Sequence, residues 1–218
     1  MGRFSFVLLL VLLLTACGGA GDRKAKYFQR GMELFEQGNI VKARLEFKNV
    51  LQIDPKDAEA YYMVGRIEEQ EQNWRKAYAL FLRAVELDPG HANAQVHLGR
   101  IYVMAGETQK GLDAAEAALK IDPKSSTALL LKAVAESRMG NKDKAMDEAM
   151  AAMELDPTSF DAISLLSALY ADQGNMEQAV VMAKRGLEQK PESVVAHLLL
   201  ARLYERQGNQ AGAIQMLE

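Results

Sequence analysis

Residues 58–89 read AEAYYMVGRIEEQEQNWRKAYALFLRAVELDP, and this stretch contains the pattern that organises most of the chain. It ends in Asp88-Pro89, and prolines stand at positions 55, 89, 123, 157 and 191, so each follows the previous one by 34 residues. The chain has no other proline. Self-similarity at such a fixed period is typical of a solenoid built from two-helix repeats.

Six repeats of 34 positions result when the proline is assigned to repeat position 32, and they start at Lys24, Ala58, Ala92, Ser126, Phe160 and Val194. Repeat positions 8 and 20 carry a small residue in every repeat, for example Gly65 and Ala77. Apolar residues recur around them every three or four positions, which indicates two amphipathic helices. We therefore expect the two helices of each repeat to cross closely at positions 8 and 20.

Glycine and proline mark the ends of these helices. Repeat position 15 is occupied by Gly38, Gly106, Gly140, Gly174 and Gly208, and glycine readily adopts the left-handed conformation that ends a helix. Gln72 stands at this position in the second repeat. That turn is predicted to be strained or to use Asn73 instead. The proline at position 32 cannot continue the second helix.

Taken together, these positions resemble the tetratricopeptide repeat from Lys24 to Glu218. The resemblance implies an all-α fold, a right-handed α-solenoid of helix-turn-helix hairpins. Trp74 matches an aromatic position of the family and is expected in the core. The last repeat stops at Glu218, repeat position 25, so we expect the natural chain to continue or to end against a partner.

The first seventeen residues have the pattern of an export signal. Arg3 is followed by an almost wholly apolar run from Phe4 to Leu14, which is too short to span a bilayer comfortably. The sequence Leu14-Thr15-Ala16-Cys17 resembles the lipobox of bacterial lipoproteins, which implies that Cys17 is acylated, as with palmitate, and becomes the amino terminus. The alternative is a plain secretory signal in which Cys17 has no role.

This resemblance divides the chain into a signal peptide at 1–16, a lipidated cysteine with a flexible tether at 17–23, and the repeat array at 24–218. Glycines 18, 19 and 21 are expected to end any helix there. Residue 18 is glycine and not aspartate, which by the same resemblance favours the periplasmic face of the outer membrane. Several acyl chains on one cysteine anchor a protein stably.

Composition and motifs argue against several classes of function. The net charge of −3 offers no basic field for nucleic acid, and the single cysteine allows neither an internal disulfide nor a zinc site of paired cysteines. The three histidines, His91, His97 and His197, are scattered, and no phosphate loop or nucleophile motif is present. We therefore expect no enzyme, no cofactor, no metal and no small-molecule substrate.

The remaining candidate for function is the surface stripe at repeat positions 2, 5, 9, 12 and 13 of each first helix. In the tetratricopeptide family this stripe lines a concave groove that holds peptides. The predicted groove residues are Tyr62, Arg66, Glu69, Asn93, Val96, Arg100, Val103, Met104, Leu130 and Arg138. Arg66 and Arg100 share position 9 with Arg202 and, together with Tyr62, are candidates to bind carboxylates or a sugar acid.

The alternative is that Arg66 pairs with Glu69 and that the arginines are merely solvated. A lysine and asparagine clamp for a C-terminal carboxylate, known in this family, is not expected, because its positions in the first repeat hold Ala25, Phe28, Gln29 and Met32.

The expected function is a membrane-anchored periplasmic scaffold that binds protein or peptide partners in an envelope assembly or export system. The chain is similar in build to the repeat lipoproteins of exopolysaccharide export and PEP-CTERM sorting. Two alternatives remain at this point: a pilotin-like lipoprotein of type IV pilus assembly, and the docking arm of an envelope enzyme whose catalytic domain lies beyond Glu218.

Overall fold

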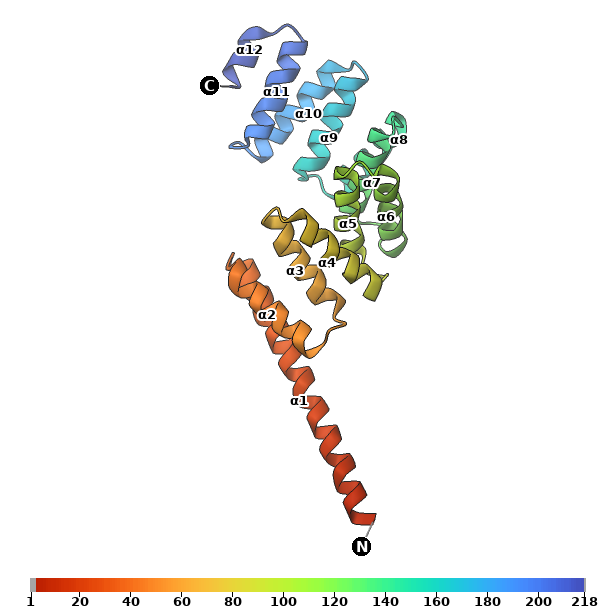
Figure 1. The fold of residues 1–218 in the computed structure, drawn as a ribbon. Coiled ribbons are helices and arrows are strands. Elements are labelled where there is room, and N and C mark those ends of the chain that lie inside the picture. Colours follow the sequence, from red (N-terminus) through yellow and green to blue (C-terminus); the bar gives the residue numbers. More distant parts are fainter. Residues whose placement is uncertain (1–2, 218) are drawn as a thin grey trace. The chain divides into compact units, whose positions relative to one another are not determined.

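The structure, a computed structural model, describes the backbone of residues 3–217 and the side chains of residues 19–217. This part of the chain is helical apart from its turns. The helices are α1 (Arg3–Glu36), α2 (Ile40–Ile53), α3 (Ala58–Gln70), α4 (Trp74–Leu87), α5 (Ala92–Met104), α6 (Thr108–Ile121), α7 (Ser126–Arg138), α8 (Lys142–Leu155), α9 (Phe160–Asp172), α10 (Met176–Gln189), α11 (Val194–Arg206) and α12 (Gln210–Gln215) (Figure 1).

The chain consists of two compact parts, which divide between Ala94 and Gln95 and are described here separately. In the first part α1 packs on α2, α2 on α3, and α3 on α4. In the second part each helix from α6 to α12 packs on the next one. The predicted all-α solenoid of helical hairpins is confirmed.

The two helices of a hairpin cross at the small residues of repeat positions 8 and 20. A Cβ atom on Gly65 would lie only 2.7 Å from the ring of Phe81, which is fully buried. In the fifth hairpin the buried Ser167 hydroxyl donates a hydrogen bond to the carbonyl oxygen of Ala179 at 2.8 Å. These two residues are the pair predicted to touch, so the predicted crossing point is confirmed.

The turns follow the glycine pattern. The glycines at repeat position 15 have φ between +74° and +85°, and Gln72 takes their place with a φ of +60°. In the second hairpin the left-handed residue of the turn is therefore Gln72 and not Asn73. This conformation is energetically unfavourable for a residue with a Cβ atom.

The starts of α3, α5, α7, α9 and α11 share a signal that the repeat analysis missed. The side chain at repeat position 34 caps the helix by accepting a hydrogen bond from the backbone N–H three residues later. It does so in Asp57, His91, Ser125, Ser159 and Ser193.

Methionines fill the core of the fourth hairpin, which lacks an aromatic residue in α8. Met146 is buried with Ala145 and Ala149, and Met150 and Met153 pack against the same cluster. Flexible thioether side chains adapt to such irregular spaces. Trp74, in contrast, was wrongly predicted to be a core residue. It is the first residue of α4 and is 37% exposed.

The expectation that glycines 18, 19 and 21 end a helix was also wrong, whereas the tether at residues 17–23 stays a prediction. Helix α1 continues without interruption from Arg3 to Glu36, through the glycines. Glycine permits the left-handed conformation but does not impose it, and in a helix interior it costs only about 1 kcal/mol relative to alanine.

The Cys17 side chain lies outside the described side chains, so its predicted lipidation stays a prediction. Among the described residues, we find no helix with the length and apolarity needed to cross a membrane.

Candidate functional site

The predicted groove residues of α3 form an aromatic and cationic cluster instead of a free binding surface. Tyr62 is buried, and its ring centroid lies 4.6 Å from that of His91. The Arg66 guanidinium lies over the Phe35 ring of α1, at 5.1 Å from the ring centroid, and over the Tyr62 ring at 5.9 Å. Burial raises the pKa of the Tyr62 hydroxyl, while the nearby Arg66 charge acts against this.

These contacts give Arg66 a structural role. Cation–π contacts with two rings join α1 to α3 and restrict the rotation of the guanidinium. Glu69, on the same helix, is half-buried. The cluster therefore stabilises the first part of the chain, and Arg66 is less available for a carboxylate than the sequence predicted.

Two further groove predictions are corrected, because Val96 and Val103 are core residues. They are only 5% and 3% exposed. Val103 packs against α6 so closely that a Cβ atom on Gly111 would collide with its side chain. Repeat position 12 therefore faces the partner helix of the same hairpin here. The remaining predictions on α5 and α7 vary in exposure: Asn93, Arg100 and Met104 are exposed, and Leu130 is half-buried.

Arg138 lies at the predicted position but is used within the protein. Its Nη1 donates a hydrogen bond to the carbonyl oxygen of Val103 at 2.8 Å. This carbonyl is near the C-terminus of α5, where helical carbonyls lack an intrahelical partner and attract a cation. Arg138 therefore ties its hairpin to the preceding one.

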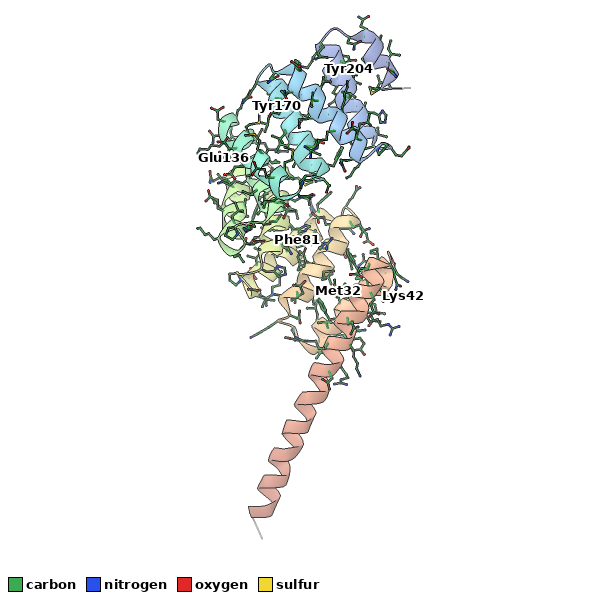
Figure 2. All side chains as sticks on the ribbon, turned by 180° about the vertical axis from the view of Figure 1, so that it is seen from behind. Met32, Lys42, Phe81, Glu136, Tyr170 and Tyr204 are labelled. Atoms are coloured by element: carbon green, nitrogen blue, oxygen red, sulfur yellow. The ribbon has the colours of Figure 1, made fainter. Side chains whose placement is uncertain are left out.

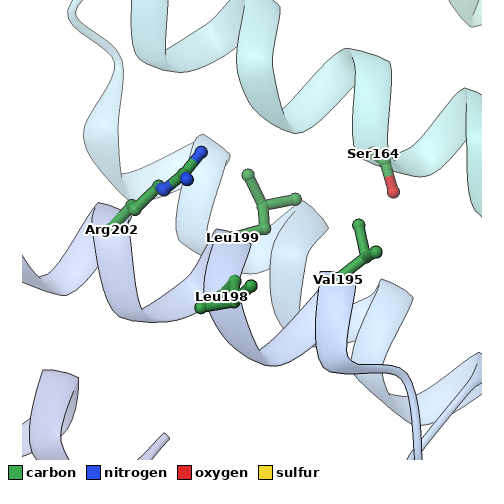
Figure 3. A pocket seen from close by; sticks show the side chains of 5 residues that line it. All are labelled: Ser164, Val195, Leu198, Leu199 and Arg202. Atoms are coloured by element: carbon green, nitrogen blue, oxygen red, sulfur yellow. The ribbon is translucent and has the colours of Figure 1, made fainter. Parts of the chain in front are cut away.

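A concave site with free polar groups occurs further along the same stripe, between α9 and α11. It is a cavity of about 240 Å³ lined by Ser164, Val195, Leu198, Leu199 and Arg202. Ser164 extends from α9 toward α11, and Val195 and Arg202 lie at the two ends of the α11 lining (Figure 3). We refer to these five residues as the α9–α11 pocket.

The α9–α11 pocket combines exposed apolar side chains with unused polar groups. Val195 and Leu198 are 62% and 40% exposed. The Ser164 hydroxyl oxygen is shielded from solvent and has no hydrogen-bond partner among the described residues. A polar atom without a partner at such a place costs free energy, which a ligand with a matching group would recover. Arg202 is exposed and forms no ion pair within residues 19–217.

Of these residues the sequence had indicated only Arg202. Ser164, Val195 and Leu198 occupy repeat positions 5, 2 and 5, which belong to the predicted groove stripe. Extending the same stripe to the last two repeats would have found them. Leu199, at position 6, carries no such signal.

A second polar cluster that the sequence analysis missed has a structural role. Buried Glu68 accepts a hydrogen bond from Asn73 at 3.0 Å, and its carboxylate lies 3.3 Å from Arg44 of the preceding hairpin. Arg44 also donates a hydrogen bond to the carboxylate of Glu71, and this bond lowers the pKa of Glu71. In the fourth hairpin Glu136 and Asn141 repeat the Glu–Asn bond at 2.6 Å. The signal is a glutamate followed five residues later by an asparagine.

Within the described residues, no group of histidine, cysteine or acidic side chains is arranged to hold a metal ion. Helical hairpins of this geometry, with an apolar pocket that has a cation at its rim, define a helical-repeat protein. Its surface is suited to binding other chains.

Comparison with known families agrees with this class. One family model of the tetratricopeptide repeat matches residues 28–92, 70–126 and 96–160, and a second matches residues 170–218. The chain therefore belongs to the tetratricopeptide repeat family, whose fold is that of a scaffold for protein–protein interaction. A comparison with curated proteins finds no match.

Solved structures of the same fold are similar over most of their length. PilF of Pseudomonas aeruginosa has a TM-score of 0.74 at 16% identity, over 91% of this chain and 90% of PilF. PilW, a type IV pilus biogenesis factor, has a TM-score of 0.77 at 19% identity, over 88% and 90%. YrrB, a tetratricopeptide repeat protein with an unusual peptide-binding site, has a TM-score of 0.58 at 21% identity, over 78% and 88%.

Proposed function

We propose that this protein is a lipid-anchored scaffold of the bacterial cell envelope that binds an extended segment of a partner protein along α9 and α11. The observation that carries the binding function is the α9–α11 pocket, where exposed Val195 and Leu198 adjoin the Ser164 hydroxyl and Arg202, neither of which has a side-chain partner among the described residues. An apolar concave site with few polar groups is the usual form of a ligand site.

The spacing of the pocket residues specifies the chemistry of the segment. Val195 and Arg202 are seven residues apart on one helix, which corresponds to about 10 Å along its axis. An extended peptide covers this distance in about three residues. The partner would therefore insert an aliphatic side chain between Val195 and Leu198 and pair an acidic residue, about two to three positions away, with Arg202.

Site-specific photocrosslinking in cells tests this function. A photoreactive amino acid at Leu198 is expected to capture a discrete partner protein. The matched control is Val181 on α10, which is similarly exposed but lies outside the pocket. Arg202→Glu should abolish the adduct at residue 198. If residues 198 and 181 give the same products, or none, the binding function of this pocket is refuted.

The lipid anchor is supported by the order of residues in Leu14-Thr15-Ala16-Cys17, directly after the apolar run. We propose that Cys17 carries the lipid and that the array lies at the periplasmic face of the outer membrane. Cys17→Ser should move the protein from the membrane fraction to the soluble periplasm. Retention of the variant in the outer-membrane fraction would exclude a lipid on Cys17 as the anchor.

Two pathways are proposed for the scaffold. The first is exopolysaccharide export or extracellular protein sorting, as the lipoprotein build indicates. The second is type IV pilus assembly, which is favoured by the full-length similarity in fold to PilF and PilW. Deleting the gene and measuring surface pili and secreted polysaccharide separates the two, since each pathway predicts loss of one product only.

A further inference from the structure

The outer surface of the first hairpin differs from that of every other hairpin at the same repeat positions. Val41 and Leu45, at positions 18 and 22 of α2, lie one turn apart and are 72% and 58% exposed. The corresponding residues of the later hairpins are also exposed, yet no other pair is wholly large and apolar. The pairs are Arg75 and Ala79, Gln109 and Asp113, Asp143 and Asp147, Glu177 and Val181, and Ala211 and Gln215.

The exposed charges that α2 itself carries beside Val41 and Leu45 are positive. Lys42 and Lys48 are exposed and form no ion pair with any described residue, and Lys42 lies at the outer edge of the first hairpin (Figure 2). The only acidic residue of α2 is Glu46, which is buried and lies 3.4 Å from Arg30. The solvent-facing charge of this helix is therefore purely cationic. At the same positions, α8 presents the carboxylates of Asp143 and Asp147.

We infer that the exposed face of α2, formed by Val41, Lys42, Leu45, Lys48 and Gln52, docks on the surface of an anionic lipid bilayer. Aliphatic side chains interleaved with lysines on one helical face are the composition of helices that lie in the membrane interface. The lysines attract anionic headgroups, and the aliphatic pair enters the boundary of the acyl chains. The inference is independent of the peptide site.

The position of this face near the proposed anchor favours lipid over an acidic protein as its partner. Cys17 and Val41 are 24 positions apart, and α1, the helix that connects them, packs directly on α2, so Val41 lies within about 30 Å of the proposed anchor along the helix. An anchor at Cys17 would hold the face at a high effective concentration near the membrane. Even a modest intrinsic affinity for lipid then suffices for docking. This step alone rests on the proposed function.

The test is lipid photocrosslinking of the full chain in vesicles. The full chain is mixed with vesicles of phosphatidylethanolamine and phosphatidylglycerol that contain a photoactivatable phosphatidylglycerol, and labelled peptides are mapped by mass spectrometry. We expect labelling of residues 41–52 at roughly ten times the level of residues 177–188, which occupy the same repeat positions in α10. Val41→Ser with Leu45→Ser should reduce the labelling of α2 to that of α10.

Charge and anchor are tested in separate arms. Lys42→Gln with Lys48→Gln should lower the labelling in these vesicles and have little effect in vesicles of phosphatidylcholine alone. In the Cys17→Ser chain the total labelling should fall, while the ratio of α2 to α10 stays high. If the ratio of α2 to α10 labelling stays high in this variant, docking by α2 is supported, whatever the total labelling is. If the total labelling is the same as in the unmodified chain, only the lipid anchor at Cys17 is contradicted.

The inference is overturned if α2 and α10 are labelled equally in the unmodified chain. It is equally overturned if neither the unmodified chain nor the Cys17→Ser chain associates with the vesicles. It is also overturned if Val41→Ser with Leu45→Ser leaves the labelling of α2 unchanged.

Discussion

Arg138 and Val103 are joined across consecutive hairpins, because the Arg138 guanidinium donates to the Val103 carbonyl oxygen at 2.8 Å. Arg206 makes the same bond with the Ala171 carbonyl at 3.0 Å. Both arginines occupy repeat position 13, and both carbonyls belong to position 12. The bond thus recurs between the third and fourth hairpins and between the fifth and sixth, at the C-terminal ends of their first helices.

We predict that Arg138→Ala lowers the free energy of unfolding by about 1 kcal/mol, because a charged hydrogen bond to a partly buried carbonyl is lost. Urea denaturation measures the change. Arg202→Ala is the matched control, since Arg202 lies on the same stripe and forms no ion pair with the described residues. Equal effects of the two substitutions would contradict a specific role for the Arg138 bond.

Gln72→Gly should stabilise the second hairpin by about 1 kcal/mol. Gln72 has a φ of +60°, a conformation that glycine adopts without the steric cost of a Cβ atom. Gly140→Gln makes the reverse change at the same repeat position and should destabilise the fourth hairpin. Hydrogen exchange of the two turns would report each effect locally, and a slower exchange in the glutamine form of either turn would contradict the argument.

Gly65→Ala and Gly186→Ala should act with opposite signs. A Cβ atom at residue 65 would lie 2.7 Å from the Phe81 ring, so crowding should cost about 1–3 kcal/mol. At residue 186 the nearest atom would be 3.5 Å away, and removal of a glycine from a helix should then stabilise by up to about 1 kcal/mol. Phe81→Leu, combined with Gly65→Ala, should relieve the crowding at residue 65. Thermal unfolding of the three variants measures the sign of each change in stability.

The Lys24 ion pairs should make the first part of the chain sensitive to acid. Lys24 Nζ lies 2.9 Å from carboxylate oxygens of both Asp54 and Asp57. The hydrogen bond from Lys24 lowers the pKa of Asp54 below its usual 3.8, and the bond to Asp54 raises the pKa of Lys24 above 10.5. The Asp54 contribution is therefore present above pH 3.8 and is lost as the pH falls through the lower folded pKa.

Lys24→Met should remove less than about 1 kcal/mol near neutral pH, because both side chains are more than a third exposed. The loss should shrink as the pH falls through the lowered folded pKa of Asp54, and again as the pH rises through the raised folded pKa of Lys24. Stability measured from pH 2 to 12 tests this, with Lys26→Met as the control. A difference between Lys24→Met and the parent that is constant with pH would exclude an ionic origin.

The sequence alone determined where most helices end. Glycine at repeat position 15 and proline at position 32 act through local backbone geometry, so their period of 34 residues specified the hairpins directly. The small residues at positions 8 and 20 determined the crossing point, because only close packing requires small side chains in every repeat. The same local reasoning failed at glycines 18, 19 and 21, since glycine allows a helix to end but does not require it.

Only the tertiary structure decided which residues of the predicted groove face solvent. Val103 and Arg138 lie on the predicted stripe, yet one packs on α6 and the other bonds to the preceding hairpin. Exposure depends on neighbours from the other helix of the same hairpin and from the adjacent hairpin, and repeats that share a fold differ in those neighbours. For this reason the candidate site lies between α9 and α11, where Ser164 and Arg202 have no partner within the described chain, and not on α3, where Phe35 and Tyr62 enclose Arg66.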